Sequence, residues 1–162
     1  MPDQPHDPST TASLSPLLRI KLLDPRAILP AYQTDGSAGM DLAACLPEGQ
    51  SITLPPGERA LIPCGYVLAI PHGYEGQVRP RSGLASKFGV TLPNTPGTID
   101  SDYRGQAMVS LVNLGRETFT VTHAMRIAQL VIAPVTRARV AVVDSLEDTA
   151  RGSGGFGSTG TH

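Results

Sequence analysis

The residues of this chain that could do chemistry fall into five short stretches. Each sets charged, hydroxyl or amide side chains beside glycine, which lets a ligand approach the backbone closely and leaves N–H groups free to bind anions. Arginine, whose planar fork of donors suits phosphoryl oxygens, recurs among them. The pattern predicts a site for an anionic ligand. The stretches are GSAGMDLAA (36–44), RPRSGLASK (79–87), NTPGTIDSDYRGQ (94–106), RIAQL (126–130) and RGSGGFGSTG (151–160).

Taken singly, residues in these stretches also have structural interpretations. Asp100 and Asp102 are typical turn formers in DSDYRG, and Pro96-Gly97 fits a simple β-turn. The last stretch has the composition of a flexible tail, although a tail needs neither its arginine nor its phenylalanine. For Asp100, these residues alone favour a turn and a catalytic role equally.

Composition limits the class of protein. A chain of 162 residues suggests one domain, and an aromatic fraction of 4% leaves the core to aliphatic side chains. The net charge of −1 predicts no general attraction to nucleic acid or to anionic membranes. Cys45 and Cys64 lack metal-ligand spacing, so we expect two buried, reduced thiols. With neither a signal peptide nor a long apolar run, the cytoplasm is the expected location.

Several familiar catalytic motifs are absent from the sequence. It contains no GxxxxGK[ST] phosphate loop, no GxGxxG after a strand, and neither HExxH nor GxSxG. The four histidines are scattered, and we expect each of them to lie in a solvated loop or tail. The five stretches, in contrast, do concentrate unusual chemistry.

The elements that must position these stretches are predicted to be short β-strands. Residues 1–16 are rich in Pro, Ser, Thr and Asp and are predicted to be a disordered extension. One or two helical turns are expected at 82–88. The pattern favours an all-β sandwich or barrel. Val, Ile and Thr enrichment, in several cases with period-2 alternation, predicts strands at 18–24, 59–70, 106–113, 117–122, 126–135 and 137–144.

In order and spacing, the five stretches closely resemble the five motifs of the trimeric dUTP pyrophosphatases (dUTPases), over residues 17–160. The resemblance implies an all-β jelly roll with one short helix, spanning residues 17–148. It also implies a homotrimer with active sites at subunit interfaces, and Mg²⁺-dependent hydrolysis of dUTP to dUMP and pyrophosphate. Such an enzyme keeps uracil out of DNA and supplies dUMP for thymidylate synthesis.

The resemblance assigns roles within residues 94–106. Asp100 matches the catalytic aspartate, which would orient a water molecule and take its proton during attack on the α-phosphorus. Tyr103 would pack under the deoxyribose and leave no room for a 2′-hydroxyl, whereas taken alone it is an ordinary half-buried tyrosine. The uracil-reading hairpin corresponds to Asn94 and to the backbone of Gly97, Thr98, Ile99 and Asp100.

Arg81, Ser82 and Gly83 match the phosphate motif of the family, although Ser82 could simply be the N-cap of a short helix. The resemblance makes Gln129 a phosphate contact, and strand alternation places its side chain on the same face as Ile127 and Val131.

Two further positions before Gln129 are informative. Arg126 is expected to be structural, in an intersubunit ion pair. The family commonly has Gly and an acidic or polar residue where this chain has Ala124 and Met125, which puts the type of that turn in doubt.

Asp41 matches a family aspartate near the metal. It would support Mg²⁺ through water or anchor a neighbouring arginine, because Mg²⁺ takes most of its direct ligands from substrate phosphates. From the residues alone, an N-cap or a buried ion pair is an equal alternative.

The C-terminal stretch corresponds to a flexible lid, residues 149–162, which closes over a site belonging to other subunits. Phe156 would stack on uracil and Arg151 would reach the γ-phosphate. Contacts from Gly157, Ser158 and Thr159 would complete the lid.

Two rival interpretations stay open. A relative of the dCTP deaminases would share the jelly roll and parts of the motifs. A non-catalytic nucleotide-binding relative is the second rival, but it predicts loss of Asp100 or of the tail, and the sequence has both.

Overall fold

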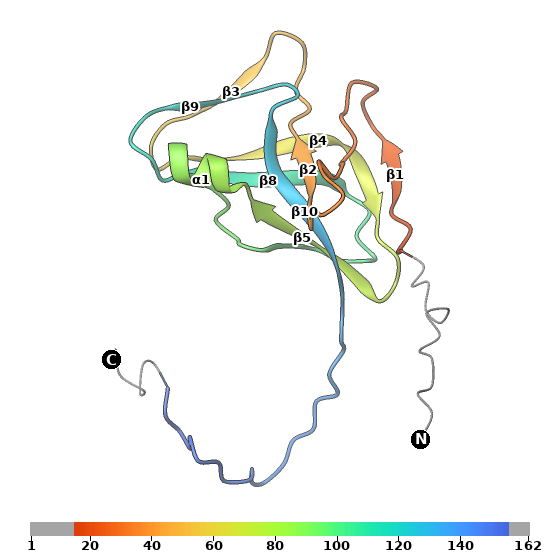
Figure 1. Cartoon of the computed structure of the whole chain (residues 1–162), viewed down its shortest axis with the longest axis vertical. Helices are drawn as coiled ribbons and strands as arrows, with labels where there is room; N and C mark the ends of the chain where they lie inside the picture. Colours follow the sequence, from red (N-terminus) through yellow and green to blue (C-terminus); the bar gives the residue numbers. More distant parts are fainter. Residues whose placement is uncertain (1–14, 156–162) are drawn as a thin grey trace, which may run out of the picture.

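The computed structural model describes residues 15–155, which form two antiparallel four-stranded sheets, a two-stranded sheet and a short helix (Figure 1). The first sheet has the order β1 (Arg19–Leu22), β4 (Arg59–Ala69), β8 (Gln106–Asn113), β6 (Val90–Thr91). The second has the order β2 (Met40–Ala43), β10 (Arg126–Pro134), β5 (Tyr74–Pro80), β7 (Gly97–Ile99). The remaining elements are β3 (Ser51–Leu54), β9 (Phe119–Thr122) and helix α1 (Ser82–Phe88).

Both four-stranded sheets contribute to one aliphatic core. Along β8, buried and half-buried residues alternate strictly, as the period-2 pattern of the sequence predicts. Val109 and Leu111 of β8 belong to the same buried cluster as Leu42 of β2 and Leu130 of β10. The all-β class with a single short helix is therefore confirmed for the described residues.

Asn113 is a fully buried polar residue at the end of β8. Its side-chain amide donates hydrogen bonds of 2.8 Å to the carbonyl oxygens of Leu54 and Glu117. Its side-chain oxygen accepts from the amide of Gly115 at 2.9 Å. Because all of these groups are satisfied, the residue ties β3 and the turn after β8 to the first sheet without the usual penalty for burying an amide.

Most of the predicted elements are present, with small changes at their ends. The predicted helix at 82–88 coincides with α1, and the strands predicted at 59–70, 106–113 and 126–135 correspond to β4, β8 and β10. Five strands were not predicted from the sequence: β2, β3, β5, β6 and β7. Glycine and proline interrupt the apolar pattern of β5, and β6 and β7 are only two and three residues long.

The strand predicted at 137–144 is wrong for this chain. The segment has no regular structure and runs away from the body after β10 (Figure 1). Val140 and Val142 are 94% and 98% exposed. A strand is stable only when another strand or an apolar surface pairs with it, and no described part of the chain does so here.

The two cysteines are free and buried, which confirms the prediction of two reduced thiols. Burial raises the pKa of the Cys64 thiol to about 12, so this thiol is protonated at neutral pH. In residues 15–155, no helix is long or apolar enough to cross a membrane.

His72 lies exposed in a turn, as predicted, but His123 does not simply face solvent. Its Nδ1 atom accepts a hydrogen bond of 3.2 Å from the amide of Leu46. His6 and His162 lie outside the described residues.

The turn between β9 and β10 keeps a left-handed residue although glycine is absent. Ala124 has a φ of 65° and lies between His123 and Met125, whose amide donates to the carbonyl of Thr122 at 3.2 Å. This is the position at which a type II turn requires positive φ. The turn therefore keeps a left-handed backbone at this position, but the residue is a strained alanine where the family commonly has glycine.

Ala124→Gly is expected to stabilise the fold by about 0.5–1 kcal/mol, because glycine adopts positive φ without a Cβ clash. Urea unfolding of both proteins would measure the change. An unchanged or lower free energy of unfolding would show that the strain at Ala124 is negligible.

Candidate active site

The second sheet contains residues of four of the five stretches, and three of these stretches meet on strands β2, β10 and β5. In the register of β2, β10 and β5, Gln129 lies opposite Asp41 on one side and Arg79 on the other. Residues directly opposite one another in antiparallel strands point to the same face of the sheet. Stretches separated by dozens of residues in the sequence therefore present their polar side chains on one surface.

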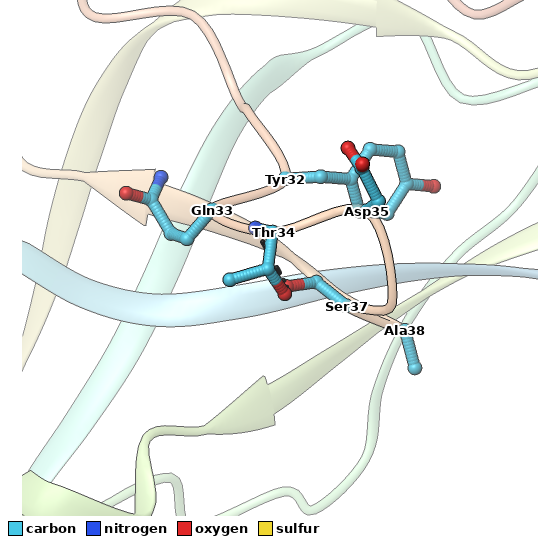
Figure 2. Close-up of a pocket in the computed structure, with 6 residues that line it drawn as sticks. All are labelled: Tyr32, Gln33, Thr34, Asp35, Ser37 and Ala38. Atoms are coloured by element: carbon cyan, nitrogen blue, oxygen red, sulfur yellow. Dashed lines mark hydrogen bonds between the residues drawn. The ribbon is translucent and has the colours of Figure 1, made fainter.

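The loop before β2 sets the position of Asp41. An isolated bridge joins Ala31 to Asp41, whose amide donates to the Ala31 carbonyl at 3.0 Å. Between them, Thr34 and Ser37 close a tight turn through a side-chain contact of 2.8 Å. This loop also surrounds an open hollow of about 460 Å³, lined by Tyr32, Gln33, Thr34, Asp35, Ser37 and Ala38 (Figure 2).

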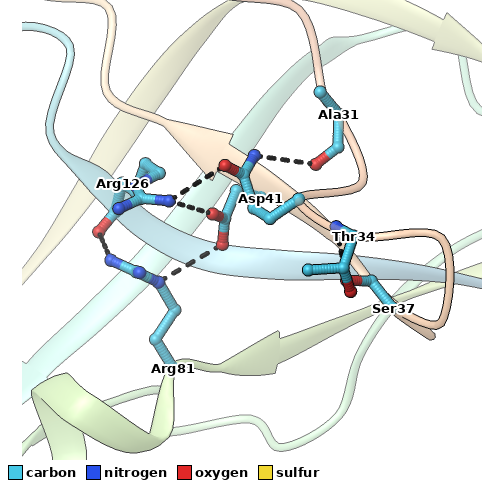
Figure 3. A network of polar contacts seen from close by, with 7 residues as sticks. Ala31, Thr34, Ser37, Asp41, Arg81 and Arg126 are labelled. Carbon is cyan, nitrogen blue, oxygen red and sulfur yellow. Dashed lines mark hydrogen bonds and ion pairs between the residues drawn. The ribbon is translucent and has the colours of Figure 1, made fainter.

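Asp41 forms ion pairs with two arginines of the same chain (Figure 3). Its carboxylate lies 3.3 Å from Nε of Arg81 and 2.9 Å from a terminal nitrogen of Arg126. Arg81 also donates to the backbone carbonyl of Arg126 at 2.9 Å. The Asp41 side chain is only 15% exposed, which strengthens these pairs relative to solvated ones. One carboxylate thus orients two cations and leaves a net positive charge on this surface.

Arg126 pairs with Asp41 of its own chain, across the β2–β10 register. The intersubunit ion pair expected for Arg126 stays a prediction, since it concerns a contact between two chains. The alternative of Ser82 as the N-cap is wrong. The N-cap of α1 is Arg81, whereas Ser82 is the first helical residue. The carbonyl of Arg81 accepts the amides of Leu84 and Ala85 at 3.1 Å.

Gln129 is half-buried beside this network. Its side-chain nitrogen donates to the Pro80 carbonyl at 2.9 Å, which ties β10 to the start of α1. A Cβ at Gly39 would lie 2.7 Å from the side-chain oxygen of Gln129, so this glycine makes the room that the amide occupies.

The predicted grouping of Gln129 with Ile127 is wrong. The pairing of β10 with β2 shifts register between Arg126 and Ala128, and both Ile127 and Ala128 are buried in the core. Such a bulge adds one residue to the alternation, so Ile127 points to the core and Gln129 does not.

Asp100 follows directly after β7 and is exposed. None of the ion pairs among the described residues involves it. It lines an open pocket of about 710 Å³ together with His72, Glu75, Asp102 and Arg137. This carboxylate is therefore free to meet a water molecule or a ligand.

The segment 100–105 is a compact turn. The amide of Tyr103 donates to the Asp100 carbonyl at 3.1 Å. Arg104 donates to the carbonyls of Ser101 and Tyr103 at 2.8 and 2.7 Å, and the Tyr103 hydroxyl donates to the Gln106 carbonyl at 3.2 Å. Tyr103 nevertheless stays 47% exposed, so part of this residue is available to a ligand.

The segment expected to form a uracil-reading hairpin is not a paired two-strand hairpin. β7 pairs with β5, while β8, which follows the turn, pairs with β4 and β6. The strands on the two sides of the turn thus belong to different sheets. Asn94 lies beside Gly97, since a Cβ at Gly97 would be 3.2 Å from the Asn94 side-chain nitrogen.

A single chain brings together only part of the predicted site. Asp41, Arg81 and Gln129 lie together, but the residues lining the pocket of Asp100 include none of these three. In the tail, the Arg151 side chain donates to the Gly154 carbonyl at 2.9 Å. The predicted contacts at Phe156, Gly157, Ser158 and Thr159 lie outside the described residues.

Two residues that contact this surface were not predicted from the sequence. Gln33 accepts from Arg126 at 3.2 Å, and Gly39 makes room for Gln129. In the sequence, only the place of Gly39 in GSAGMDL could have indicated its role. Gln33 precedes that stretch, and no motif includes it. In the described part of the chain, no group of three or more His, Cys, Asp or Glu residues could hold a metal ion.

Comparisons with known proteins identify relatives of this chain. The family model described as dUTPase matches residues 25–160. The deoxyuridine 5'-triphosphate nucleotidohydrolase of Rhizobium meliloti is 56% identical over 158 residues, which cover 96% of this chain and 99% of the relative. That of Methylocella silvestris is 62% identical over 132 residues, or 82% of each chain.

A solved structure of Staphylococcus bacteriophage 80alpha dUTPase with dUPNHPP superposes with a TM-score of 0.80 at 27% identity, covering 90% of this chain and 99% of that one. The named relatives and the shared fold place the chain among all-β enzymes that hydrolyse nucleotides. With the family model matching most of its length, the chain belongs to the dUTPase family.

Proposed function

We propose that this chain is a dUTP diphosphatase, which hydrolyses dUTP to dUMP and pyrophosphate. The observation that carries the proposal is the family match over residues 25–160, which includes all five polar stretches. The reaction keeps uracil out of DNA and supplies dUMP for thymidylate synthesis. A cytoplasmic location belongs to this proposal, and the two free, buried thiols are consistent with it.

The phosphate chain of dUTP binds on the surface around Arg81. Arg81 supplies a guanidinium whose orientation is maintained by Asp41, and Ser82 and Gly83 open the neighbouring helix. Gln129 adds an amide beside them. An arginine held by a carboxylate before ligand arrives loses less conformational freedom on binding, which favours this role.

Asp100 acts on the attacking water. Its carboxylate orients the water toward the α-phosphorus and accepts a proton from it as the new P–O bond forms. The bond from the α-phosphorus to the bridging oxygen breaks, and pyrophosphate leaves with that oxygen. The exposed position of Asp100 and its lack of an ion pair among the described residues support this assignment.

Uracil is read by Asn94 and by the backbone of Gly97, Thr98 and Ile99, and the sugar packs against Tyr103. Cytosine reverses part of the donor and acceptor pattern of uracil, so it would leave buried polar groups unpaired. The exposed part of the Tyr103 ring supports its role as a surface for the deoxyribose.

Mg²⁺ is the metal that the family implies, and the donor set fits a metal that takes its direct ligands from phosphates and water. Both oxygens of the Asp41 carboxylate already face arginines, so Asp41 would reach the metal through water. When bound, Mg²⁺ neutralises charge on the phosphates and on the leaving pyrophosphate. Asp41 maintains the orientation of Arg81 with or without it.

The homotrimer is part of the same proposal. In one chain the phosphate surface and the pocket of Asp100 are separate, which fits a site completed by another subunit. The segment after β10 exposes the apolar side chains of Val140, Val142 and Leu146. A row of exposed apolar side chains is typical of a segment that binds to another protein surface.

Truncation after Ala150 is expected to lower kcat/KM for dUTP by about 10–100-fold, because it removes Arg151 and Phe156 from the proposed lid. Size-exclusion chromatography should show an unchanged assembly, while a pyrophosphate-release assay records the loss. Full activity of the truncated chain would contradict the lid.

The proposed function is tested by measuring pyrophosphate release from dUTP, dTTP, dCTP and UTP, with and without Mg²⁺. We expect release from dUTP with Mg²⁺ and little from the other nucleotides. Release of ammonia from dCTP would favour a relative of the dCTP deaminases. Binding of dUTP without turnover would favour a non-catalytic relative.

A further inference from the structure

We propose that Gly105 is a positioning residue for sugar specificity, because the absence of a side chain at this position lets the Tyr103 ring lie where it does. The proposal rests on the proposed function, in which Tyr103 packs against the deoxyribose. It concerns a residue that touches no substrate and acts only through the tyrosine ring.

A side chain at Gly105 would meet the ring of Tyr103. A Cβ built on Gly105 would contact the Tyr103 hydroxyl, and it would lie 2.5 Å from Cζ and 2.9 Å from Cε2 of the same ring. Carbon atoms that are not bonded to each other need about 3.5–4.0 Å. All three of the nearest atoms belong to Tyr103, so a methyl group at Gly105 conflicts with the tyrosine ring.

Alanine at this position should move the ring and leave the fold intact. Gly105 is not among the glycines with positive φ, so its backbone conformation suits an ordinary residue. The ring is a half-exposed side chain that can turn toward solvent, whereas the backbone of the turn is held by Arg104 through the carbonyls of Ser101 and Tyr103.

Among the described residues, a single long hydrogen bond holds the hydroxyl of the Tyr103 ring in its present position. The Tyr103 hydroxyl donates to the Gln106 carbonyl at 3.2 Å, across Gly105. A methyl group at Gly105 would displace the Tyr103 hydroxyl, which it would contact, and the ring would lose both this hydrogen bond and its place beside the glycine. Discrimination against the 2′-hydroxyl would then fall, because it depends on a ring fixed at close range.

The test compares kcat/KM for dUTP and for UTP in four proteins: wild type, Gly105→Ala, Tyr103→Ala and the double variant. We expect Gly105→Ala to lower the dUTP-to-UTP ratio at least about tenfold. In the Tyr103→Ala background the same substitution should change the ratio less than about twofold, because the ring through which it acts is gone. Gly49→Ala is the control, since Gly49 lies outside the five polar stretches and a Cβ there meets nothing within 4 Å, and its ratio should equal that of wild type.

Two results would overturn the proposal: an unchanged ratio in Gly105→Ala, or an equal fall with and without Tyr103. A crystal structure of Gly105→Ala provides a second readout that needs no turnover, and a Tyr103 ring in its original position would also overturn it. A wild-type protein that releases no pyrophosphate from dUTP would instead contradict the proposed function, while the crystal structure would still decide whether Gly105 seats the ring.

Discussion

Asp100→Asn is expected to lower kcat for dUTP hydrolysis by about 10²–10⁴-fold, while the affinity for the nucleotide changes little. The amide has almost the shape of the carboxylate but cannot accept a proton from the attacking water. Because Asp100 is exposed and no ion pair among the described residues uses it, the substitution should leave the fold unaffected. Stopped-flow measurement of pyrophosphate release under saturating dUTP, with Kd from calorimetry, would separate turnover from binding.

Asp102→Asn is the matched control for this prediction. Asp102 lies two residues away in the same turn and lines the same pocket, but its proposed role is only to form the turn. We expect its kcat to stay within about threefold of wild type, since no step of the proposed reaction uses it. Equal losses in the two variants would indicate an effect of the turn and refute the assignment of the base to Asp100.

Gly65→Ala is expected to reduce the free energy of unfolding by about 3 kcal/mol or more, the largest effect on stability among these predictions. Gly65 is buried in β4 with a φ of +81°. An added Cβ would lie 2.6 Å from Sγ of Cys45 and 2.8 Å from Cβ of Ala27. The backbone cannot move away easily, because the Gly65 carbonyl accepts the amides of Leu23 and Asp24 at 2.9 and 3.1 Å.

Urea denaturation at neutral pH would measure this loss. Gly57→Ala separates backbone strain from crowding, since Gly57 has a φ of +83° but nothing within 4 Å of its added Cβ. We expect Gly57→Ala to cost only about 1–2 kcal/mol, the strain of a left-handed alanine. If both substitutions cost the same, the contacts with Cys45 and Ala27 contribute nothing and crowding at Gly65 is not the cause.

Local patterns predicted elements well where the chain itself supplies the partner. The alternation in 106–113 became β8, because this segment buries an apolar side in the core. The segment 82–88 became α1 although none of its residues is fully buried and only Leu84 packs, partly buried, against the same core. The same kind of pattern failed at 137–144, where the described chain offers no surface to receive Val140 and Val142. An alternating pattern indicates that a segment can form a strand. Whether a neighbouring strand or surface is there to pair with it depends on the tertiary structure.

The sequence by itself determined the family, the all-β class and the residue types of the site, since these depend on motifs and periodicity within short segments. Only the tertiary structure decided that Asp41 lies between Arg81 and Arg126, and that a bulge separates Ile127 from Gln129. Contacts between residues 40 to 85 positions apart depend on strand register, and register is set by the packing of the whole core. The position of the Tyr103 ring beside Gly105 was also decided only by the tertiary structure. The sequence shows that Gly105 has no side chain, but not which atoms occupy the space that a side chain would need.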